Sequence, residues 1–315
     1  MNTIKTLVVF LFAGVLLTSC SKAKYRKTAG GMPYQLFKGN GTDSQQIKAG
    51  DFIKVQFTRK IKDSIYFTTA GTLPVYMQVN NMTQPYDISE LWTSLRVGDS
   101  VVATQAMDTF MKRDPRNIPP EFKKGDKITY YIKVTGRFSS DSAARADYDK
   151  SNKDWLAGEV LTIQKFLEEK KITAQKTPSG AFVETINPGT GNLIDSGKYV
   201  SVKYTGTSWS GKKFDTNVDS TFGHTDLLSF TAGTAGTQGG MIKGFDEGIQ
   251  LMRSGGKAKI YVPSILGYAG NPGSPNIKPY ENLVFDIEVL QVQDKAPVAK
   301  REMPPIQTVP VPAQH

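Results

Sequence analysis

The sequence has few residues of the kinds that most enzymes use for chemistry. It contains one cysteine and two histidines among 315 residues. A single thiol excludes both a disulfide framework and a zinc site built from cysteines. One of the two histidines, His315, is the last residue, so a histidine-based metal site or catalytic triad is not expected. The sequence therefore predicts no metal and no cofactor.

The remaining composition is that of a folded chain with a basic excess. Hydrophobic residues make up 39% and charged residues 22%, which is typical of globular domains with apolar cores. The formal net charge of +10 would by itself favour polyanionic partners. Dense basic character is confined to residues 22–27, and the other cations are dispersed. We therefore expect solubilising lysines and no nucleic-acid partner.

The first 20 residues have the pattern of a bacterial export signal. Lys5 precedes an apolar run from Leu7 to Leu17, which is shorter than the roughly 20 residues that a membrane-spanning helix needs and suits a secretory signal. The run ends at residues 17–20 (LTSC), which resemble a lipobox, in which the cysteine is lipidated. The alternative is an ordinary signal peptide followed by an incidental cysteine. We predict lipidation of Cys20 and a location in the bacterial cell envelope, on the outer membrane facing the periplasm or the surface.

Strand-like alternation flanks one helical segment. Residues 52–58 and 128–134 alternate apolar and polar side chains, as half-buried strands do. Residues 142–171 lack proline, and their apolar side chains follow helical spacing. The predicted organisation is a signal peptide (1–19), a lipidated tether (20–32), a first domain (33–140), a helical linker (141–177), a second domain (178–293) and a disordered tail (294–315).

An internal repeat relates the two domains. The matching segments are 50–58 with 197–205 and 67–69 with 214–216 at an offset of 147, 96–98 with 253–255 at 157, and 128–130 with 283–285 at 155. A nearly constant offset over about 80 residues indicates two copies of one small domain.

The second copy carries an ordered set of motifs. They are residues 200–206 (VSVKYTG), 211–216 (GKKFDT), 241–248 (MIKGFDEG), 255–258 (GGKA), 261–263 (YVP), 266–268 (LGY) and 283–288 (LVFDIE). In this order they resemble the FKBP-type peptidyl-prolyl isomerases over residues 180–292. The resemblance implies an enzyme that interconverts cis and trans X-Pro peptide bonds.

The residue pattern is compatible with the fold that this resemblance implies. Residues 283–289 and 258–262 each place apolar side chains on one strand face. One face of a short helix carries Ile242, Phe245, Ile249 and Met252. We predict an α+β fold with two FKBP-like domains. Each domain is expected to be a twisted antiparallel sheet wrapped around a short helix.

Prolyl isomerisation also explains the scarcity of catalytic residue types. The barrier of ~18–20 kcal/mol arises largely from amide resonance, and an apolar cup can lower it without a nucleophile or a metal. The resemblance implies four catalytic residues, Tyr204, Asp215, Tyr268 and Phe285, and six that bind substrate, Phe214, Phe230, Met241, Ile242, Phe245 and Ile277. Phe245 would be the floor beneath the proline ring. The Ile242 N–H and the Tyr268 hydroxyl would bind substrate carbonyls, and Asp215 would polarise the cup beside Tyr204. Plain core packing of the aromatic residues, and a turn role for Asp215, are the alternatives.

The first copy has lost these residues at the positions that the offsets relate. By these offsets Phe57 occupies the position equivalent to Tyr204, Thr68 that of Asp215, and Ile88 that of Phe245. The change of offset from 147 to 157 predicts the loss of part of a pocket-forming loop. We expect this copy to bind, dimerise or act as a spacer. In the second copy, His224 lies in a long loop over residues 221–240 and is expected to be exposed, with no partner for a metal or for catalysis.

These observations predict a lipid-anchored isomerase that assists the folding of exported proteins. Its expected partners are proline-containing unfolded or exported polypeptides, and a membrane reached through the N-terminal lipid. The oligomeric state is left open. The alternative is a non-catalytic chaperone or assembly lipoprotein whose two folds bind unfolded client chains.

Overall fold

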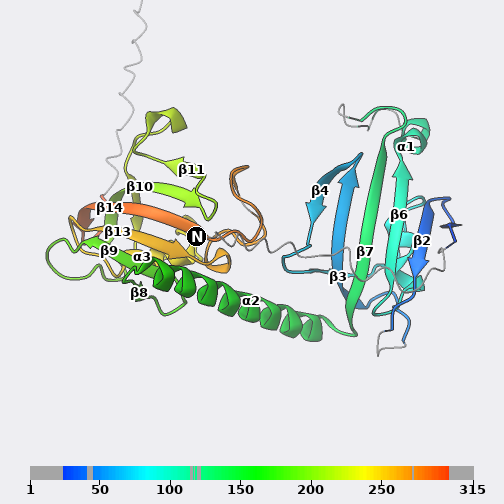
Figure 1. Cartoon of the computed structure of the whole chain (residues 1–315), viewed down its shortest axis with the longest axis horizontal. Coiled ribbons are helices and arrows are strands. Elements are labelled where there is room, and N and C mark those ends of the chain that lie inside the picture. Colours follow the sequence, from blue (N-terminus) through cyan, green and yellow to red (C-terminus); the bar gives the residue numbers. More distant parts are fainter. Residues whose placement is uncertain are drawn as a thin grey trace, which may run out of the picture. The chain divides into compact units, whose positions relative to one another are not determined.

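The computed structural model describes residues 24–40, 45–113, 116, 118, 122–271 and 273–297. The predicted signal peptide, Cys20 and nearly all of the predicted tail lie outside these residues. The chain divides into two units, residues 1–151 and 152–315, each with its own sheet (Figure 1). Each sheet has seven antiparallel strands. Within the described ranges, no helix combines the length and the apolar character that crossing a membrane requires.

The first unit is built mainly of strands. They are β1 (Arg26–Lys27), β2 (Pro33–Phe37), β3 (Phe52–Ile61), β4 (Ser64–Thr68), β5 (Val75–Gln78), β6 (Ser100–Ala106) and β7 (Lys127–Phe138). Two 3-10 turns, η1 (Ile88–Glu90) and η2 (Trp92–Ser94), precede β6, and the short helix α1 (Met107–Arg113) follows it.

The second unit has the same succession of strands. They are β8 (Gln175–Lys176), β9 (Phe182–Asn187), β10 (Tyr199–Ser208), β11 (Lys213–Thr216), β12 (Leu228–Thr231), β13 (Lys257–Val262) and β14 (Leu283–Gln293). The 3-10 turn η4 (Ser220–Phe222) lies between β11 and β12, the helix α3 (Lys243–Ile249) precedes β13, and η5 (Ser264–Leu266) follows it. The segment predicted as one long loop over 221–240 thus contains a strand, β12.

Strand order shows that the two units are copies of one fold. The first sheet runs β1-β2-β6-β7-β3-β4, and the second runs β8-β9-β13-β14-β10-β11. The remaining strand pairs at the same place in both, β5 with β3 and β12 with β10. The predicted α+β class with two domains of one fold is confirmed.

Side chains that alternate along the strands build each core. Ile53 and Val55 are buried on β3, and Val200 and Val202 are buried on β10. In the second unit Phe245 and Ile249 of α3 pack against these strand residues in one cluster. The helix thereby covers one face of the sheet, on which the predicted site residues lie.

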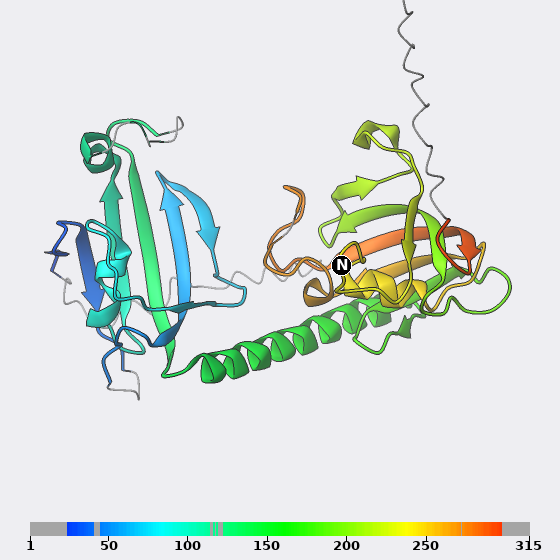
Figure 2. The same ribbon diagram turned by 180° about the vertical axis from the view of Figure 1, so that it is seen from behind.

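The helix α2 (Asp141–Lys170) connects the two units and ends seven residues before the predicted limit of 177. It stops where Lys171 adopts a positive φ of 57°. Val160, Ile163 and Leu167 pack against Phe182 and Tyr261. The strand neighbours of these two residues, Val183 and Ile260, belong instead to the apolar cluster that contains α3 residues. Alternation along a strand therefore places α2 and α3 on opposite faces of the second sheet, and Figures 1 and 2 show them from opposite sides. The second part of α2 belongs to the second unit.

The boundary predicted between tether and first domain at residue 33 is wrong. Arg26 and Lys27 pair with Tyr34 and Pro33 as strand β1, and the Met32 side chain is completely buried. Because Met32 joins the apolar core of the first unit, residues 26–32 belong to that unit.

Candidate active site

Four aromatic side chains from four elements form a cup in the second unit. Phe245 of α3 is 2% exposed. Its ring centroid lies 6.4 Å from that of Tyr204 on β10, 5.8 Å from Phe230 on β12 and 5.1 Å from Phe285 on β14. We call these four residues, with Phe214, the aromatic cup. Phe245 thus contacts three of the other rings, and its role as the floor beneath a proline ring stays a prediction.

Phe214, the fifth residue of the cup, and the remaining predicted apolar residues lie beside the other four rings. The Phe214 ring lies 5.7 Å from Phe285 and 6.2 Å from Tyr268, edge-on in both cases. Ile277 is buried in the same cluster, and Met241 and Ile242 pack against it half-buried. The fold thus gathers residues spread from position 204 to position 285 into one site.

Gly206 permits the close approach of two cup residues, a role that the sequence reasoning missed. A Cβ atom built on Gly206 would lie 2.6 Å from the Phe214 ring and 3.1 Å from the Phe285 ring. No side chain fits there unless the rings move. The signal was a glycine inside a strand pattern, which often marks close approach of another group.

Asp215 lies at the edge of the cup and has two side-chain partners. The Tyr204 hydroxyl donates a hydrogen bond to Asp215 Oδ2, and His224 Nε2 lies 2.9 Å from Asp215 Oδ1. Burial, this hydrogen bond and the charge of Asp215 raise the pKa of Tyr204, so its hydroxyl stays protonated. His224 is exposed as predicted, but the expectation that it has no partner for catalysis is wrong, because it contacts a predicted site residue, Asp215.

Two hydrogen-bond donors at the cup have no partner within the described part of the chain. These are the backbone N–H of Ile242, just before α3, and the hydroxyl of Tyr268, which is 37% exposed. Burial and the charge of Asp215 raise the pKa of Tyr268, so its O–H remains a donor at neutral pH. Both donors are the ones predicted to bind substrate carbonyls.

A buried glutamate of α2 holds the segment that carries Tyr268 and Ile277. Glu159 is 8% exposed and accepts hydrogen bonds from Trp155 Nε1 at 2.9 Å and Ser264 Oγ at 2.5 Å. The Trp155 ring lies edge-on to Tyr280, 5.6 Å between centroids. The sequence reasoning treated α2 as a linker and missed this support.

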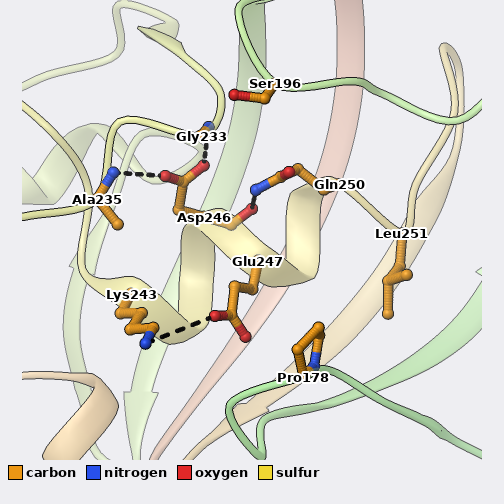
Figure 3. Close-up of a pocket in the computed structure, with 9 residues that line it drawn as sticks. All are labelled: Pro178, Ser196, Gly233, Ala235, Lys243, Asp246, Glu247, Gln250 and Leu251. Carbon is orange, nitrogen blue, oxygen red and sulfur yellow. Dashed lines mark hydrogen bonds and ion pairs between the residues drawn. The ribbon is translucent and has the colours of Figure 1, made fainter.

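A separate pocket of about 490 Å³ lies beside α3 (Figure 3), and the predicted site residues do not line it. Its acidic groups are engaged within the fold. Asp246 accepts hydrogen bonds from the backbone N–H groups of Gly233 and Ala235, each at 2.7 Å. Glu247 accepts from Ser179 Oγ at 2.6 Å. These bonds hold the segments on either side of the helix, so we assign the acidic groups of this pocket a structural role.

In the first unit, the residue at the place of Asp215 is Phe67, and the predicted equivalence with Thr68 is wrong. Thr58 pairs with Thr68 as Thr205 pairs with Thr216, with hydroxyl–hydroxyl distances of 2.7 and 2.8 Å. The hairpin between these pairs is one residue shorter in the first unit, residues 59–67 against 206–215. This deletion shifts the offset by one, and the Phe67 ring lies 5.9 Å from Phe57 where the second unit has the Tyr204–Asp215 pair.

Arg59 occupies the place of Gly206. It pairs with Tyr130 as Gly206 pairs with Phe285, and it follows Phe57 on the same strand face. Its Nε atom is buried and has no hydrogen-bond partner among the described residues. Burial raises the pKa of Tyr130 to about 12, and its hydroxyl donates to Gln105 Oε1 at 2.6 Å. A cation and a polar network therefore stand where the second unit has an apolar cup.

Comparison with known proteins identifies the second unit. The sequence model of the FKBP-type peptidyl-prolyl cis-trans isomerases matches residues 191–290. An FK506-binding protein of Neisseria meningitidis serogroup B is 36% identical over 115 residues, which are 36% of this chain and 98% of the relative. The isomerase FkpA of Escherichia coli K12 is 33% identical over 152 residues, 48% of this chain and 52% of the relative. The crystal structure of E. coli FkpA matches with a TM-score of 0.36 over 48% of this chain and 65% of that chain.

A sheet wrapped around one helix, with an aromatic cup between them, is the architecture that the motifs imply, and the Neisseria relative is matched over almost its whole length. The chain belongs to the FKBP-type peptidyl-prolyl cis-trans isomerases.

Proposed function

We propose that the aromatic cup of the second unit isomerises X-Pro bonds in unfolded, exported polypeptides, and that a lipid on Cys20 holds the protein to a membrane of the cell envelope. The observation that carries the catalytic part is the meeting of an apolar cup, the Tyr204–Asp215 pair and two unpartnered donors at one site. The pattern of residues 5–20 supports export and anchoring.

In this mechanism the proline ring lies on Phe245, between Tyr204, Phe230 and Phe285. The planar amide is charge-separated by resonance, and it is stabilised less in an apolar cup than in water. The twisted amide, whose nitrogen is less conjugated, is less charge-separated and therefore loses less solvation free energy when it enters the cup. Binding the twisted form better than the planar form lowers the barrier, and each tenfold in rate needs about 1.4 kcal/mol of such preference.

Polar groups at the rim orient the chain on either side of the proline. The Ile242 N–H and the Tyr268 hydroxyl donate hydrogen bonds to substrate carbonyls. Asp215 holds the Tyr204 hydroxyl in place and keeps a negative charge beside the cup. No step requires a proton to leave a side chain, which agrees with the raised pKa values of Tyr204 and Tyr268.

The catalytic assignment is tested by isomerisation of a proline-containing tetrapeptide with the full chain. Asp215→Val is expected to lower kcat/KM by about tenfold or more, and Tyr268→Phe by about threefold to tenfold. Tyr261→Phe is the control, because Tyr261 lies on the opposite sheet face and bonds Glu184. Unchanged rates in both site variants, with folding retained, would contradict the assignment.

Anchoring is tested separately by cell fractionation and mass spectrometry. Cys20→Ala is expected to abolish acylation and to move the protein from the membrane fraction to the soluble fraction, whereas Ser21→Ala leaves both unchanged. A wild-type protein without acyl mass would exclude the lipid anchor.

The non-catalytic alternative has one observation in its favour. The first unit keeps the fold but carries Arg59 and Phe67 at the places of Gly206 and Asp215, so client binding without isomerisation would suit that unit. Suppression of aggregation by a chain with an inactivated second unit would assign this additional role.

A further inference from the structure

Asp215 has a partner from a loop as well as one from a strand. Tyr204 of β10 uses one carboxylate oxygen, and His224, between β11 and β12, lies 2.9 Å from the other. Both side chains of the ion pair are about two-fifths exposed, 43% for His224 and 41% for Asp215. The histidine therefore meets the carboxylate at the open edge of the cup.

The loop that carries His224 is fixed to β10. Asn217 is 3% exposed, and its Oδ1 accepts the backbone N–H of Tyr204 at 2.8 Å. Its Nδ2 donates to the carbonyls of Val202 and Asp226, each at 3.0 Å. The bond to Asp226 holds the chain two residues beyond His224. The backbone on either side of His224 is thus anchored to β10.

Of the basic side chains near this pair in the described part of the chain, the His224 imidazole is the one that contacts Asp215. On β11, Lys213 pairs with Asp219 of the loop at 3.5 Å. Burial and the charge of Asp215 raise the pKa of Tyr268 and that of Tyr204 on β10. Among the described residues, Asp215 forms an ion pair with His224 alone.

We propose that His224 is a positioning residue of the isomerase, which in its protonated form holds the Asp215 carboxylate against Tyr204 and makes the enzyme more active at mildly acidic pH. This inference rests on the proposed role of Asp215. An imidazole changes its charge between about pH 5 and 8, and a hydrogen bond from an imidazolium to a carboxylate is stronger than one from a neutral ring. Loss of the proton therefore loosens the carboxylate and with it the Tyr204 hydroxyl.

The test measures kcat/KM of the full chain on a proline-containing tetrapeptide from pH 5.5 to 8.5. NMR exchange spectroscopy avoids a coupling protease with its own pH dependence. Wild type is expected to lose about threefold to tenfold in activity as the pH rises. His224→Asn should be flat near the high-pH level, and His224→Lys, which stays charged, should be flat near the low-pH level. His315→Asn, which removes the chain's other histidine, should keep the wild-type profile.

The variants also separate this inference from the proposed function. A wild-type profile in His224→Asn, or a pH-independent wild type, overturns the role of His224. If Asp215→Val leaves the rate unchanged at every pH, the proposed role of Asp215 fails and the role of His224 fails with it. Circular dichroism of each variant confirms that it is folded.

Discussion

The two units have separate sheets of the same topology, and they differ in a residue near the centre of each sheet. Both have the same strand order and the same cross-strand pairs, and both bury alternate residues of the equivalent strands β3 and β10. At one position, however, the second unit has Gly206 and the first has Arg59. The comparison teaches that the fold depends on many apolar positions, whereas the concave site depends on very few.

A second difference concerns the connecting helix α2. Its first part is tied to the first unit by half-exposed polar groups, with Asp147 Oδ2 2.7 Å from Lys54 Nζ and bonded to the Tyr76 hydroxyl. Its second part is packed by buried apolar side chains such as Ile163. The second part of α2 therefore belongs to an apolar core of the second unit, whereas its first part is attached to the surface of the first unit.

The sharpest way to break the comparison is to give the second unit the residue of the first. Gly206→Arg is expected to lower kcat/KM by about a thousandfold or more, equivalent to about 4 kcal/mol, because a side chain there collides with Phe214 and Phe285. The tetrapeptide assay measures the loss. Gly158→Arg is the matched control, since a Cβ atom there meets nothing within 4 Å. Full activity of Gly206→Arg would show that the site lies elsewhere.

The next largest effect is expected at the apolar part of α2. Ile163→Ala should lower the free energy of unfolding of the second unit by about 2–5 kcal/mol, since it deletes a fully buried side chain. Leu161→Ala on the same helix, 58% exposed, should cost less than about 0.5 kcal/mol. Urea unfolding followed by tryptophan fluorescence in a Trp92→Phe background, where Trp155 and Trp209 report on the second unit, makes the measurement. Equal effects would show that α2 is only a linker.

A smaller effect is the pH dependence of the free energy of unfolding, which should have opposite signs for Glu159 in the second part of α2 and Asp147 in the first part. Burial raises the pKa of Glu159 above 4.5, although donors from Ser264 and Trp155 oppose it. Above about pH 4.5 the unfolded chain has lost the Glu159 proton, whereas the folded unit still binds it. The free energy of unfolding therefore falls as the pH rises from 4.5 through the folded pKa of Glu159. Glu159→Gln should remove this slope.

Asp147 should behave in the reverse way. Burial acts to raise its pKa, but the hydrogen bonds from Lys54 and Tyr76 hold the pKa below the usual 3.8. Its contribution to stability is present above that pH and is lost as the pH falls through the folded value. Urea unfolding monitored at Trp92 should show a loss of stability below about pH 4 that Asp147→Asn lacks. The same pH slope in the Asp147→Asn protein would contradict this account.

The smallest effect is expected when the first unit is given residues of the second. Arg59→Gly with Phe67→Asp, made in the Gly206→Arg background, should yield no measurable tetrapeptide isomerisation. The 3-10 turns η1 and η2 stand where α3 supplies the floor, and the β4–β5 connection of residues 69–74 is shorter than residues 217–227. Recovered activity would show that the two substitutions alone distinguish the units.

Much of the fold and of the cup could be predicted from the sequence. Alternation indicates strands such as residues 52–58 and 128–134, and the family resemblance names ten site residues, which the structure brings together at one cup. The errors arose where a position depends on pairing. The offset of 147 aligns Thr68 with Asp215, whereas the pairing aligns Phe67 with Asp215, because a one-residue deletion in a hairpin changes the register without changing the motif.

The sequence by itself determined the class of fold, the repeat and the residue types of the site, because periodicity and motif order are local properties of the chain. Only the tertiary structure decided that Arg59 stands where Gly206 does, that His224 contacts Asp215, and that α2 packs on the second sheet. Each of these depends on contacts between residues distant in sequence, whose energies come from packing and desolvation that no local pattern records.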